Sequence, residues 1–301
     1  MTERKQIDAF SNCHPIVIFF YYISVFVFTT FVMHPFFLII SLSASLAYAV
    51  SLIGKKKAYI NLLWLSPVIL VTMLINPIFN NRGVTMLTYL PSGNPLTLES
   101  IIYGLAAGLL LSTTVVWFMT FNQVMTSDKF VYLFGKLIPS LSLVLSMTLR
   151  FVPQFKNQMH KVANTQRAIG KDVSNGTLFQ RLRHGINILS IMVTWALENA
   201  IETSDSMKSR GYGLPGRTAY SIYQFDKRDR TILICLFIFD SYLVTTGLFG
   251  LLEWRYFPMM TPLVLDIPFI TILVTYIALC FIPLIVNKEE EKQWQVTQLK
   301  T

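Results

Sequence analysis

The chain has 301 residues, of which 53% are hydrophobic and only 14% are charged, and its mean hydropathy is +0.52. That composition is more apolar than a soluble globular domain usually has, so it predicts a protein embedded in a lipid bilayer. The formal net charge of +9 then favours Lys and Arg retained in cytoplasmic loops by the positive-inside rule over a surface that binds nucleic acid.

The amino-terminal segment predicts a retained membrane anchor. It begins MTERKQIDAFSNCHP and lacks the early apolar core and the small-residue cleavage site of a secretory signal. Apolar runs then start at Pro15 and at Pro35, separated only by a turn at residues 32–34. Because about 20 apolar residues in a helix span the bilayer core, the two runs predict a helical hairpin.

Two more apolar runs predict the third and fourth membrane spans. Residues 59–79 contain Pro67, which a membrane helix tolerates when neighbouring groups satisfy the freed carbonyl. Residues 101–121 contain small side chains, including Gly104 and Gly108, which suit either the close approach of another helix or ordinary bundle packing. The connection between these runs carries turn pairs and little charge.

The last two apolar runs, residues 231–252 and 262–286, predict a second hairpin around a short connection at 253–261. The total is therefore about six spans. Asp240 and Asp266 lie within or near this hairpin, and a carboxylate inside a membrane is a candidate functional group. We expect both to be solvated or capped, because each lies close to an expected helix end or turn.

The cysteines and histidines predict neither a metal site nor a catalytic site. Cys13, Cys235 and Cys280 are widely spaced and are expected to be packed as small apolar side chains. The four histidines are too scattered for an HExxH site. The chain also lacks a GxSxG elbow and a GxxxxGK[ST] phosphate loop, so we expect no cofactor and no ATP hydrolysis by this chain itself.

The central block predicts two long amphipathic helices. The first is expected from Ser140 to a C-terminal cap at Gly170, with Pro153 kinking or starting it, and the second from about Leu178 to a cap at Gly211. Apolar side chains recur at three- and four-residue steps along one face of each helix. The face comprises Val152, Phe155, Met159, Val162, Gln166 and Ile169 in the first helix, and Leu182, Ile186, Leu189, Val193, Ala196, Ala200, Ser204 and Met207 in the second.

Both helices end in a similar sequence, QRAIG at 166–170 and MKSRG at 207–211. A basic side chain at a helix C-terminus interacts favourably with the macrodipole, which is a purely local explanation. An exposed guanidinium is also well suited to the carboxylates and backbone carbonyls of another protein. The repetition of the pattern favours the second explanation.

The block LRFVPQF...TQRAIG...ETSDSMKSRGYG...GRTAYSIYQFDKRD, together with NPIFNNRGVTMLTYLPSGNPLT upstream, resembles the transmembrane T component (EcfT/CbiQ-like family) of energy-coupling factor (ECF) transporters. The resemblance covers most of the chain. It implies an all-α integral membrane protein with about six transmembrane helices plus long cytoplasmic amphipathic coupling helices. In that family, two coupling helices end in short motifs whose arginines dock into grooves on a pair of ATPase subunits. The coupling-helix surface holds a separate substrate-binding membrane protein, the S component.

The resemblance assigns two ATPase-docking motifs to this chain. They comprise Arg167, Ala168, Ile169 and Gly170, and then Ser209, Arg210 and Gly211. Arg210 occupies the arginine position of the second motif. Alignment of the first motif on its glycine puts Ile169 where the family usually has arginine. Arg167 then either reaches the same partner from two residues earlier, or this ATPase contact is weaker or apolar here.

Three regions are expected along the chain. Residues 1–123 would form a membrane domain with about four transmembrane helices, 124–230 a cytoplasmic or interfacial coupling-helix domain, and 231–301 a transmembrane hairpin with a cytoplasmic tail. The basic segments all fall on one side of this arrangement, so both termini are expected to be cytoplasmic in a bacterial or archaeal cell membrane.

The expected function is that of a non-catalytic coupling subunit of an ECF-type importer of a vitamin or another micronutrient. Its expected partners are two ATP-binding-cassette ATPase subunits, an S component and the lipid bilayer, and the resemblance implies that the S component selects the cargo. The alternatives are an independent secondary transporter, which predicts paired intramembrane charges or inverted repeats, and an integral-membrane enzyme.

Overall fold

A computed structural model describes residues 8–80, 82–89, 95–135, 139–174, 176–214, 223–262 and 266–298 of the chain. The chain divides into two compact units. Unit 1 combines Met1–Thr126 with Tyr223–Thr301, and unit 2 is Ser127–Ile222. Unit 1 is therefore built from both ends of the sequence, and unit 2 is a continuous insertion between them.

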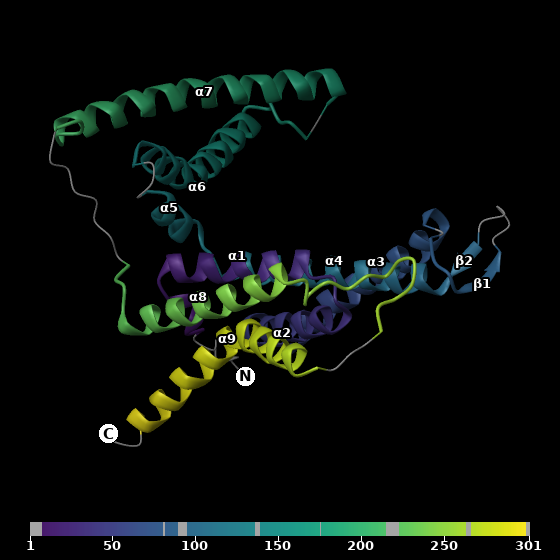
Figure 1. Ribbon diagram of the computed structural model, residues 1–301. Helices are drawn as coiled ribbons and strands as arrows, with labels where there is room; N and C mark the ends of the chain where they lie inside the picture. The colour runs from purple at the N-terminus through teal and green to yellow at the C-terminus, as the bar shows by residue number, and fades with distance from the viewer. Residues whose placement is uncertain are drawn as a thin grey trace. The chain divides into compact units, whose positions relative to one another are not determined.

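Unit 1 is a bundle of apolar helices (Figure 1). Its described helices are α1 (Pro15–Phe31), α2 (Pro35–Ile53), α3 (Lys55–Phe79), α4 (Leu98–Val124), α8 (Lys227–Leu248) and α9 (Ile267–Gln298), preceded by a short 3-10 helix, η1, at Phe10–Asn12. Five of them are long and apolar enough to cross a membrane, and α1 is a shorter apolar helix of 17 residues. The prediction of an all-α membrane protein with about six apolar helices is confirmed.

A small β-hairpin between α3 and α4 was not predicted from the sequence. Strand β1 (Met86–Tyr89) pairs antiparallel with β2 (Pro95–Thr97). Every β1 side chain is exposed, so no alternation of buried and exposed positions signals the strand. Beside the hairpin, the buried Glu99 carboxylate accepts hydrogen bonds from the Thr85 backbone N–H (3.1 Å) and hydroxyl (2.5 Å).

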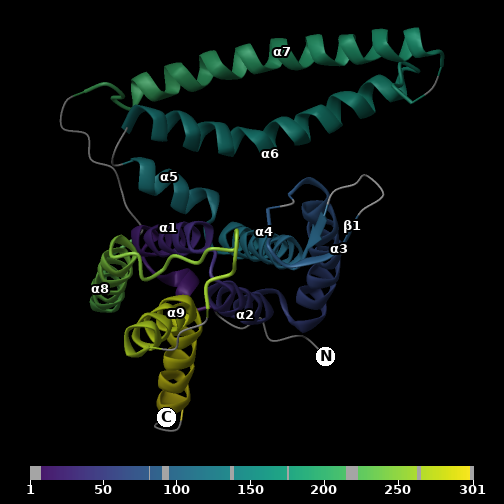
Figure 2. The same ribbon diagram turned by 45° about the vertical axis from the view of Figure 1, so that its right-hand side comes forward.

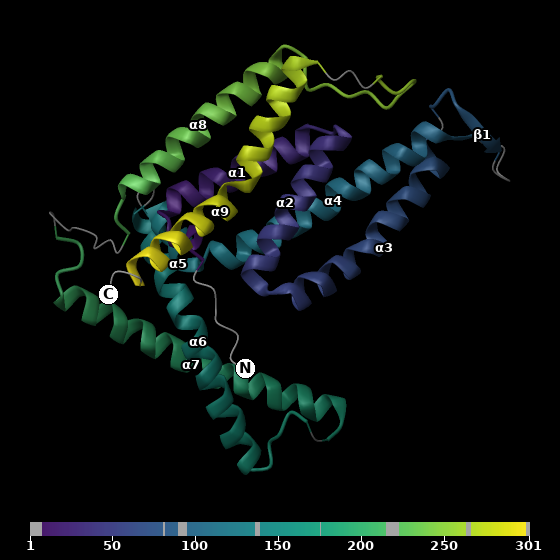
Figure 3. The same cartoon turned by 90° about the horizontal axis from the view of Figure 1, so that it is seen from below.

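Helices α3 and α4 lie side by side (Figure 3), and two glycines of α4 permit their close approach. A Cβ atom on Gly104 would stand 2.9 Å from the carbonyl oxygen of Thr72 and 3.0 Å from the Met73 Cα. A Cβ atom on Gly108 would stand 2.9 Å from the Ile69 Cα. These positions therefore serve close helix packing, one of the two roles that the sequence left open for them.

Hydrogen bonds tie the beginning of the chain to helices that come much later in the sequence. The Asp8 carboxylate accepts hydrogen bonds from the Tyr48 hydroxyl (2.9 Å) and from the Asn287 side-chain amide (2.6 Å). In the first turn of α8, Asp229 Oδ1 accepts a hydrogen bond from the His14 backbone N–H (3.2 Å). These contacts define the Asp8 end of unit 1, where α1 and α8 both begin.

The opposite end of unit 1, the His34 end, joins the α1–α2 turn to the α8–α9 connection. The Tyr256 hydroxyl donates to the Met33 carbonyl oxygen (2.7 Å). The ring centroids of Trp254 and Phe269 lie 4.6 Å and 5.1 Å from that of His34. Burial among these rings lowers the pKa of His34 from 6.5 to about 4.

Two histidines cap membrane helices, a role that their spacing in the sequence did not indicate. His14 and His34 each directly precede the proline that starts α1 or α2. In each case Nδ1 accepts a hydrogen bond of 3.3 Å from the backbone N–H two residues on, at Ile16 and at Phe36. Proline suits the first helical position because its missing N–H would have no partner within the helix.

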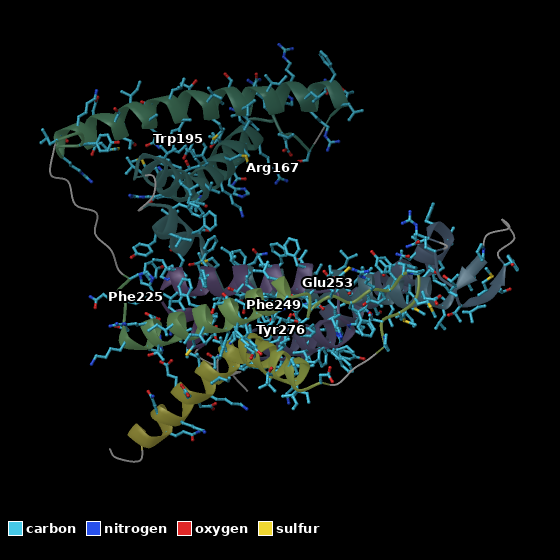
Figure 4. The ribbon with its side chains drawn as sticks, viewed as in Figure 1. Arg167, Trp195, Phe225, Phe249, Glu253 and Tyr276 are labelled. Carbon is cyan, nitrogen blue, oxygen red and sulfur yellow. The ribbon has the colours of Figure 1, made fainter. Side chains whose placement is uncertain are left out.

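Buried hydroxyl groups join four of the helices inside unit 1. The indole Nε1–H of Trp117 in α4 donates to Ser41 Oγ in α2 (2.9 Å). The Ser41 hydroxyl also lies 3.0 Å from the Thr29 hydroxyl in α1. The Thr29 hydroxyl in turn lies 3.4 Å from the Tyr276 hydroxyl in α9. Figure 4 labels Tyr276.

The two aspartates of the final hairpin differ in their surroundings. Asp266 is exposed and directly precedes α9. Asp240 lies half-buried in the middle of α8, so its expected place near a helix end is wrong. Its Oδ2 accepts a 2.5 Å hydrogen bond from Ser24 in α1, so a neighbouring helix provides the polar contact that solvent was expected to provide.

Unit 2 contains α5 (Ser127–Gly135), α6 (Pro139–Ala168) and α7 (Leu178–Ser209). Helices α6 and α7 run antiparallel and cross (Figures 2 and 3), with Phe155 and Trp195 in edge contact at 5.2 Å between ring centroids. A capping box formed by Thr177 and Gln180 starts α7. Pro153 lies inside α6, so the helix neither starts nor is interrupted there.

Replacing Gly104 with alanine tests the close approach of α3 and α4. The added methyl group would push against the α3 backbone, so we expect Gly104→Ala to lower the unfolding temperature in detergent by several degrees. Gly185→Ala is the matched control, because no atom lies within 4 Å of the place that its methyl group would occupy and alanine favours a helix. A thiol-reactive dye that reports exposure of the buried Cys13 and Cys280 provides the measurement. An equal effect of both substitutions would contradict the packing role.

Lowering the pH tests the cap at His34. Because the folded-state pKa is depressed from 6.5 to about 4, the stabilisation from neutral His34 is complete above pH 6.5 and is lost as the pH falls toward 4. We expect the unfolding temperature of the wild type to fall by a few degrees more than that of His34→Asn between pH 7 and pH 5. Asparagine retains an N-cap acceptor but does not titrate. The same fall in both proteins would show that His34 does not cause it.

Candidate functional site

The residues of both candidate docking motifs lie at the C-terminal ends of α6 and α7. The first motif covers the last residues of α6 and the turn after it, and the second covers the last residue of α7 and the two that follow. Figure 4 labels Arg167 on α6. Because α6 and α7 are antiparallel, their C-terminal ends lie at opposite ends of the helix pair (Figure 2).

Both helices end in the same backbone arrangement. After α6, the N–H of Gly170 donates to the Arg167 carbonyl (3.0 Å) and the N–H of Lys171 to the Gln166 carbonyl (2.9 Å). After α7, the N–H groups of the two residues following Arg210 donate to the Lys208 and Met207 carbonyls at 3.0 Å each. This pair of bonds is the Schellman motif, which needs a left-handed residue. Glycine meets that need at positions 170 and 211, with φ of 76° and 79°.

The shared cap fixes which residues of the two motifs correspond. Ile169 and Arg210 both occupy the C-cap position, immediately before the left-handed glycine. Arg167 corresponds to Lys208, three residues before the glycine. The alignment on glycine made from the sequence is therefore also a structural equivalence, and at the cap the first motif has an isoleucine where the second has an arginine.

The basic residues in the last turns have local acidic partners. Arg167 Nε lies 3.7 Å from Asp172 Oδ2, and Lys208 Nζ lies 3.9 Å from Asp205 Oδ1. The Ser174 hydroxyl and backbone N–H donate to Asp172 (2.6 and 3.2 Å), and these hydrogen bonds, together with Arg167, lower the pKa of Asp172. For Arg210, no carboxylate lies within ion-pair distance in the part of the chain that the structure describes, and its side chain is exposed.

The cap alone does not mark a binding site. The same pair of bonds ends α8 in unit 1, where Gly250 has φ of 75° and Phe249 holds the C-cap position. The ends of α6 and α7 differ from that end because the sequence motifs assigned from the family resemblance fall on them.

Helix α7 also carries an apolar stripe that unit 2 leaves exposed. Other apolar side chains of α7, Ile188 and Met192, are buried, and Trp195 contacts Phe155 of α6. The exposed stripe comprises Leu182 (65% exposed), Ile186 (63%), Leu189 (64%) and Val193 (52%). The first four residues of the face predicted from the sequence are therefore exposed, whereas Ala196 and Met207 farther along α7 are half-buried.

One further feature of unit 2 has no signal in the sequence. A cleft of about 340 Å³ between α5 and α6 is lined by Ser127, Asp128, Val131, Ser146, Leu149 and Arg150. Its residues come from two helices whose relative placement depends on tertiary packing. Among the described residues, no group of three or more His, Cys, Asp or Glu side chains is placed to hold a metal ion.

A protein-family comparison covers much of both units. Residues 13–220, more than half of the chain, match the CbiQ family, described as cobalt transport protein. The match covers α1 to α4 and nearly all of unit 2.

Curated relatives agree with this assignment. The "Energy-coupling factor transporter transmembrane protein EcfT" of Lactobacillus helveticus is 39% identical over 31% of this chain and 34% of its own length. The EcfT of Lacticaseibacillus paracasei is 35% identical over 38% of this chain and 42% of its own length. EcfT 1 of Listeria monocytogenes is 28% identical over 64% of this chain and 75% of its own length.

The matched segment thus spans less than half the length of the first two relatives and three quarters of the third. The family match extends over membrane helices and both candidate motifs. The chain therefore belongs to the CbiQ/EcfT family of transporter transmembrane components.

Proposed function

We propose that this chain is the coupling subunit of an ECF-type ABC importer for a vitamin or another micronutrient. It transmits ATP-driven motion from two ATP-binding-cassette ATPase subunits to a substrate-binding S component, and it does not itself hydrolyse ATP. The observation that carries the proposal is the pair of matching helix ends, which place one of the two candidate motifs at each extremity of one antiparallel helix pair. The names of the relatives, energy-coupling factor transporter transmembrane protein, support the class of transporter.

The mechanism follows from the geometry of α6 and α7. Helix α7 has 32 residues, which corresponds to a length of about 48 Å. Closure of an ATPase pair upon ATP binding would move the two docked ends relative to each other. Because capped helices resist bending more than loops do, the movement would reach the exposed stripe between the ends. The S component, held by that stripe, would then be displaced.

The charges of unit 1 support a cytoplasmic placement of its Asp8 end. Basic residues gather in the segments around that end, at the start of α3, the start of α8 and the later part of α9. They are Lys55, Lys56, Lys57, Lys227, Arg228, Arg230, Lys288 and Lys292. By the positive-inside rule, we infer that this end faces the cytoplasm, with both termini inside.

Charge reversal at Arg210 tests ATPase docking. The exposed guanidinium would meet an acidic groove, so Arg210→Glu is expected to weaken association with the ATPase subunits by at least about tenfold and to reduce uptake in proportion. The measurement is the ratio of ATPase subunits to this chain after purification from membranes. Lys156→Glu, an equal charge change at an exposed position in the middle of α6, is the control. Unchanged assembly and uptake in Arg210→Glu would refute the docking role.

A charge on the exposed stripe of α7 tests the S-component contact. Leu189→Asp would bury a carboxylate in an apolar interface. We therefore expect loss of the S component from the purified complex, while the ATPase subunits remain. Asn187→Asp places the same charge about 200° around the helix from position 189. This variant should lose neither the S component nor the ATPase subunits. Equal effects of the two variants would indicate that the stripe does not hold the S component.

A further inference from the structure

The ends of α6 and α7 share a backbone but differ in the chemistry of the residue at the cap. At the α7 end, the cap side chain is the guanidinium of Arg210. At the α6 end it is Ile169, which is 59% exposed. An exposed isoleucine, at the position where the other helix presents its cation, offers no charge to an acidic partner surface.

We propose that the α6 end docks through an apolar contact centred on Ile169 and the α7 end through an ionic contact of Arg210, so that the two ATPase surfaces differ in chemistry. The surface at the α6 end has an apolar pocket, and the surface at the α7 end has an acidic groove. This inference rests on the proposed function, since it specifies the chemistry of the partner at the same two helix ends.

More exposed apolar side chains lie in the α6–α7 connection and the first turns of α7. They are Val173 (41% exposed), Leu178 (79%) and Phe179 (78%). Arg181 Nε donates to the Val173 carbonyl (2.8 Å), which holds the start of α7 against the connection. Grouped apolar side chains exposed in this way mark an interaction surface.

The α7 end also carries apolar groups, since Tyr212 and Leu214 follow its glycine and are exposed. The difference between the two ends therefore lies in the cap residue itself. At that position the α7 end presents a cation and the α6 end a branched aliphatic side chain.

Arg167 does not replace the missing cap arginine. It lies two residues before Ile169, about 200° around the helix. Its structural counterpart is Lys208, and both side chains already have an acidic neighbour at 3.7–3.9 Å. Asp172, the neighbour of Arg167, is itself held in place by Ser174. The Nε of Arg167 therefore already contacts a carboxylate close by in the sequence.

Two identical acidic grooves would suit only one of these ends. The two caps lie at opposite ends of the helix pair, so each meets its own surface (Figure 2). A groove that is complementary to Arg210 would, against Ile169, leave its carboxylates desolvated and unpaired. An apolar pocket at the α6 end avoids that cost.

Site-specific crosslinking tests the chemistry of the two partner surfaces. A photo-crosslinking amino acid is placed at position 169 or 210 of the full chain, co-expressed with the ATP-binding-cassette subunits of its source organism, and the crosslinked peptides are sequenced by mass spectrometry. We expect position 169 to reach an apolar ATPase peptide and position 210 a peptide that contains Asp or Glu.

The pattern of crosslinks separates this inference from the proposed function. Acidic ATPase peptides at both positions, or a crosslink from position 210 alone, overturn the difference in chemistry and leave the proposed function standing. The absence of any ATPase crosslink from both positions overturns the proposed function and the inference with it.

Salt and substitution test each contact in the purified complex. Ile169→Ser is expected to weaken ATPase association by about tenfold or more, and the conservative Ile169→Val by much less. Binding that remains in Ile169→Ser should fall steeply as the salt concentration rises from about 0.1 to about 0.5 M, whereas binding that remains in Arg210→Ala should not. The same salt dependence in both variants would contradict the difference between the two contacts.

Ile169→Arg and Arg167→Ala decide between an apolar site and a weakened ionic one. We expect Ile169→Arg to weaken association, because it would bury a charge in an apolar pocket, and Arg167→Ala to change it by less than about threefold. Tighter binding of Ile169→Arg, or a large loss in Arg167→Ala, would overturn the proposal. Circular dichroism of each variant establishes that the helices remain formed.

Discussion

The last carbonyl groups of a helix need hydrogen-bond donors, and the way α6 and α7 meet that need determines the candidate site. Each of the two helices is followed by a glycine in the left-handed conformation. The N–H of this glycine and the N–H of the next residue donate hydrogen bonds to carbonyl oxygens in the last turn of the helix. The residue before the glycine is thereby held at the extreme tip of the helix. The cap therefore fixes the position of this residue relative to its helix, and the geometry is the same at the end of α6 and at the end of α7.

The same constraint organises the membrane unit, with different chemistry at the helix starts. Two imidazoles accept hydrogen bonds from free N–H groups of α1 and α2, and a proline removes another donor from each helix. At His34, a neutral imidazole can do this among aromatic rings where a carboxylate would carry a buried charge. At the start of α8, acidic groups accept the donors instead, through Asp226 and Asp229. Asp229 is itself buried and accepts a hydrogen bond from the His14 backbone N–H, so the acidic cap of α8 and the imidazole cap of α1 lie in contact.

Much of this architecture could be predicted from the sequence, because hydropathy and helix-end signals are local. The apolar runs, the two amphipathic helices and the glycine caps needed no knowledge of distant residues. The β-hairpin lacked the alternation that identifies strands. Asp8 bonds to Asn287, 279 residues away, and Asp240 to Ser24, 216 residues away, which no local pattern reveals. The exposure of the α7 stripe depends on how much of α7 is covered by α6. This coverage follows from the angle at which the two helices cross, which no local sequence pattern gives.

The contact between Asp8 and Asn287 has a consequence for how the chain is made. The ribosome synthesises the first membrane helices long before α9, which contributes Asn287 and Tyr276 to their packing. Unit 1 therefore stays incomplete in the bilayer while all of unit 2 emerges. Until α9 is inserted, polar groups of the earlier helices that bond to it, such as the Tyr21 hydroxyl, lack those partners. The hydrogen bonding inside unit 1 is therefore completed only when the last helix of the chain has been made.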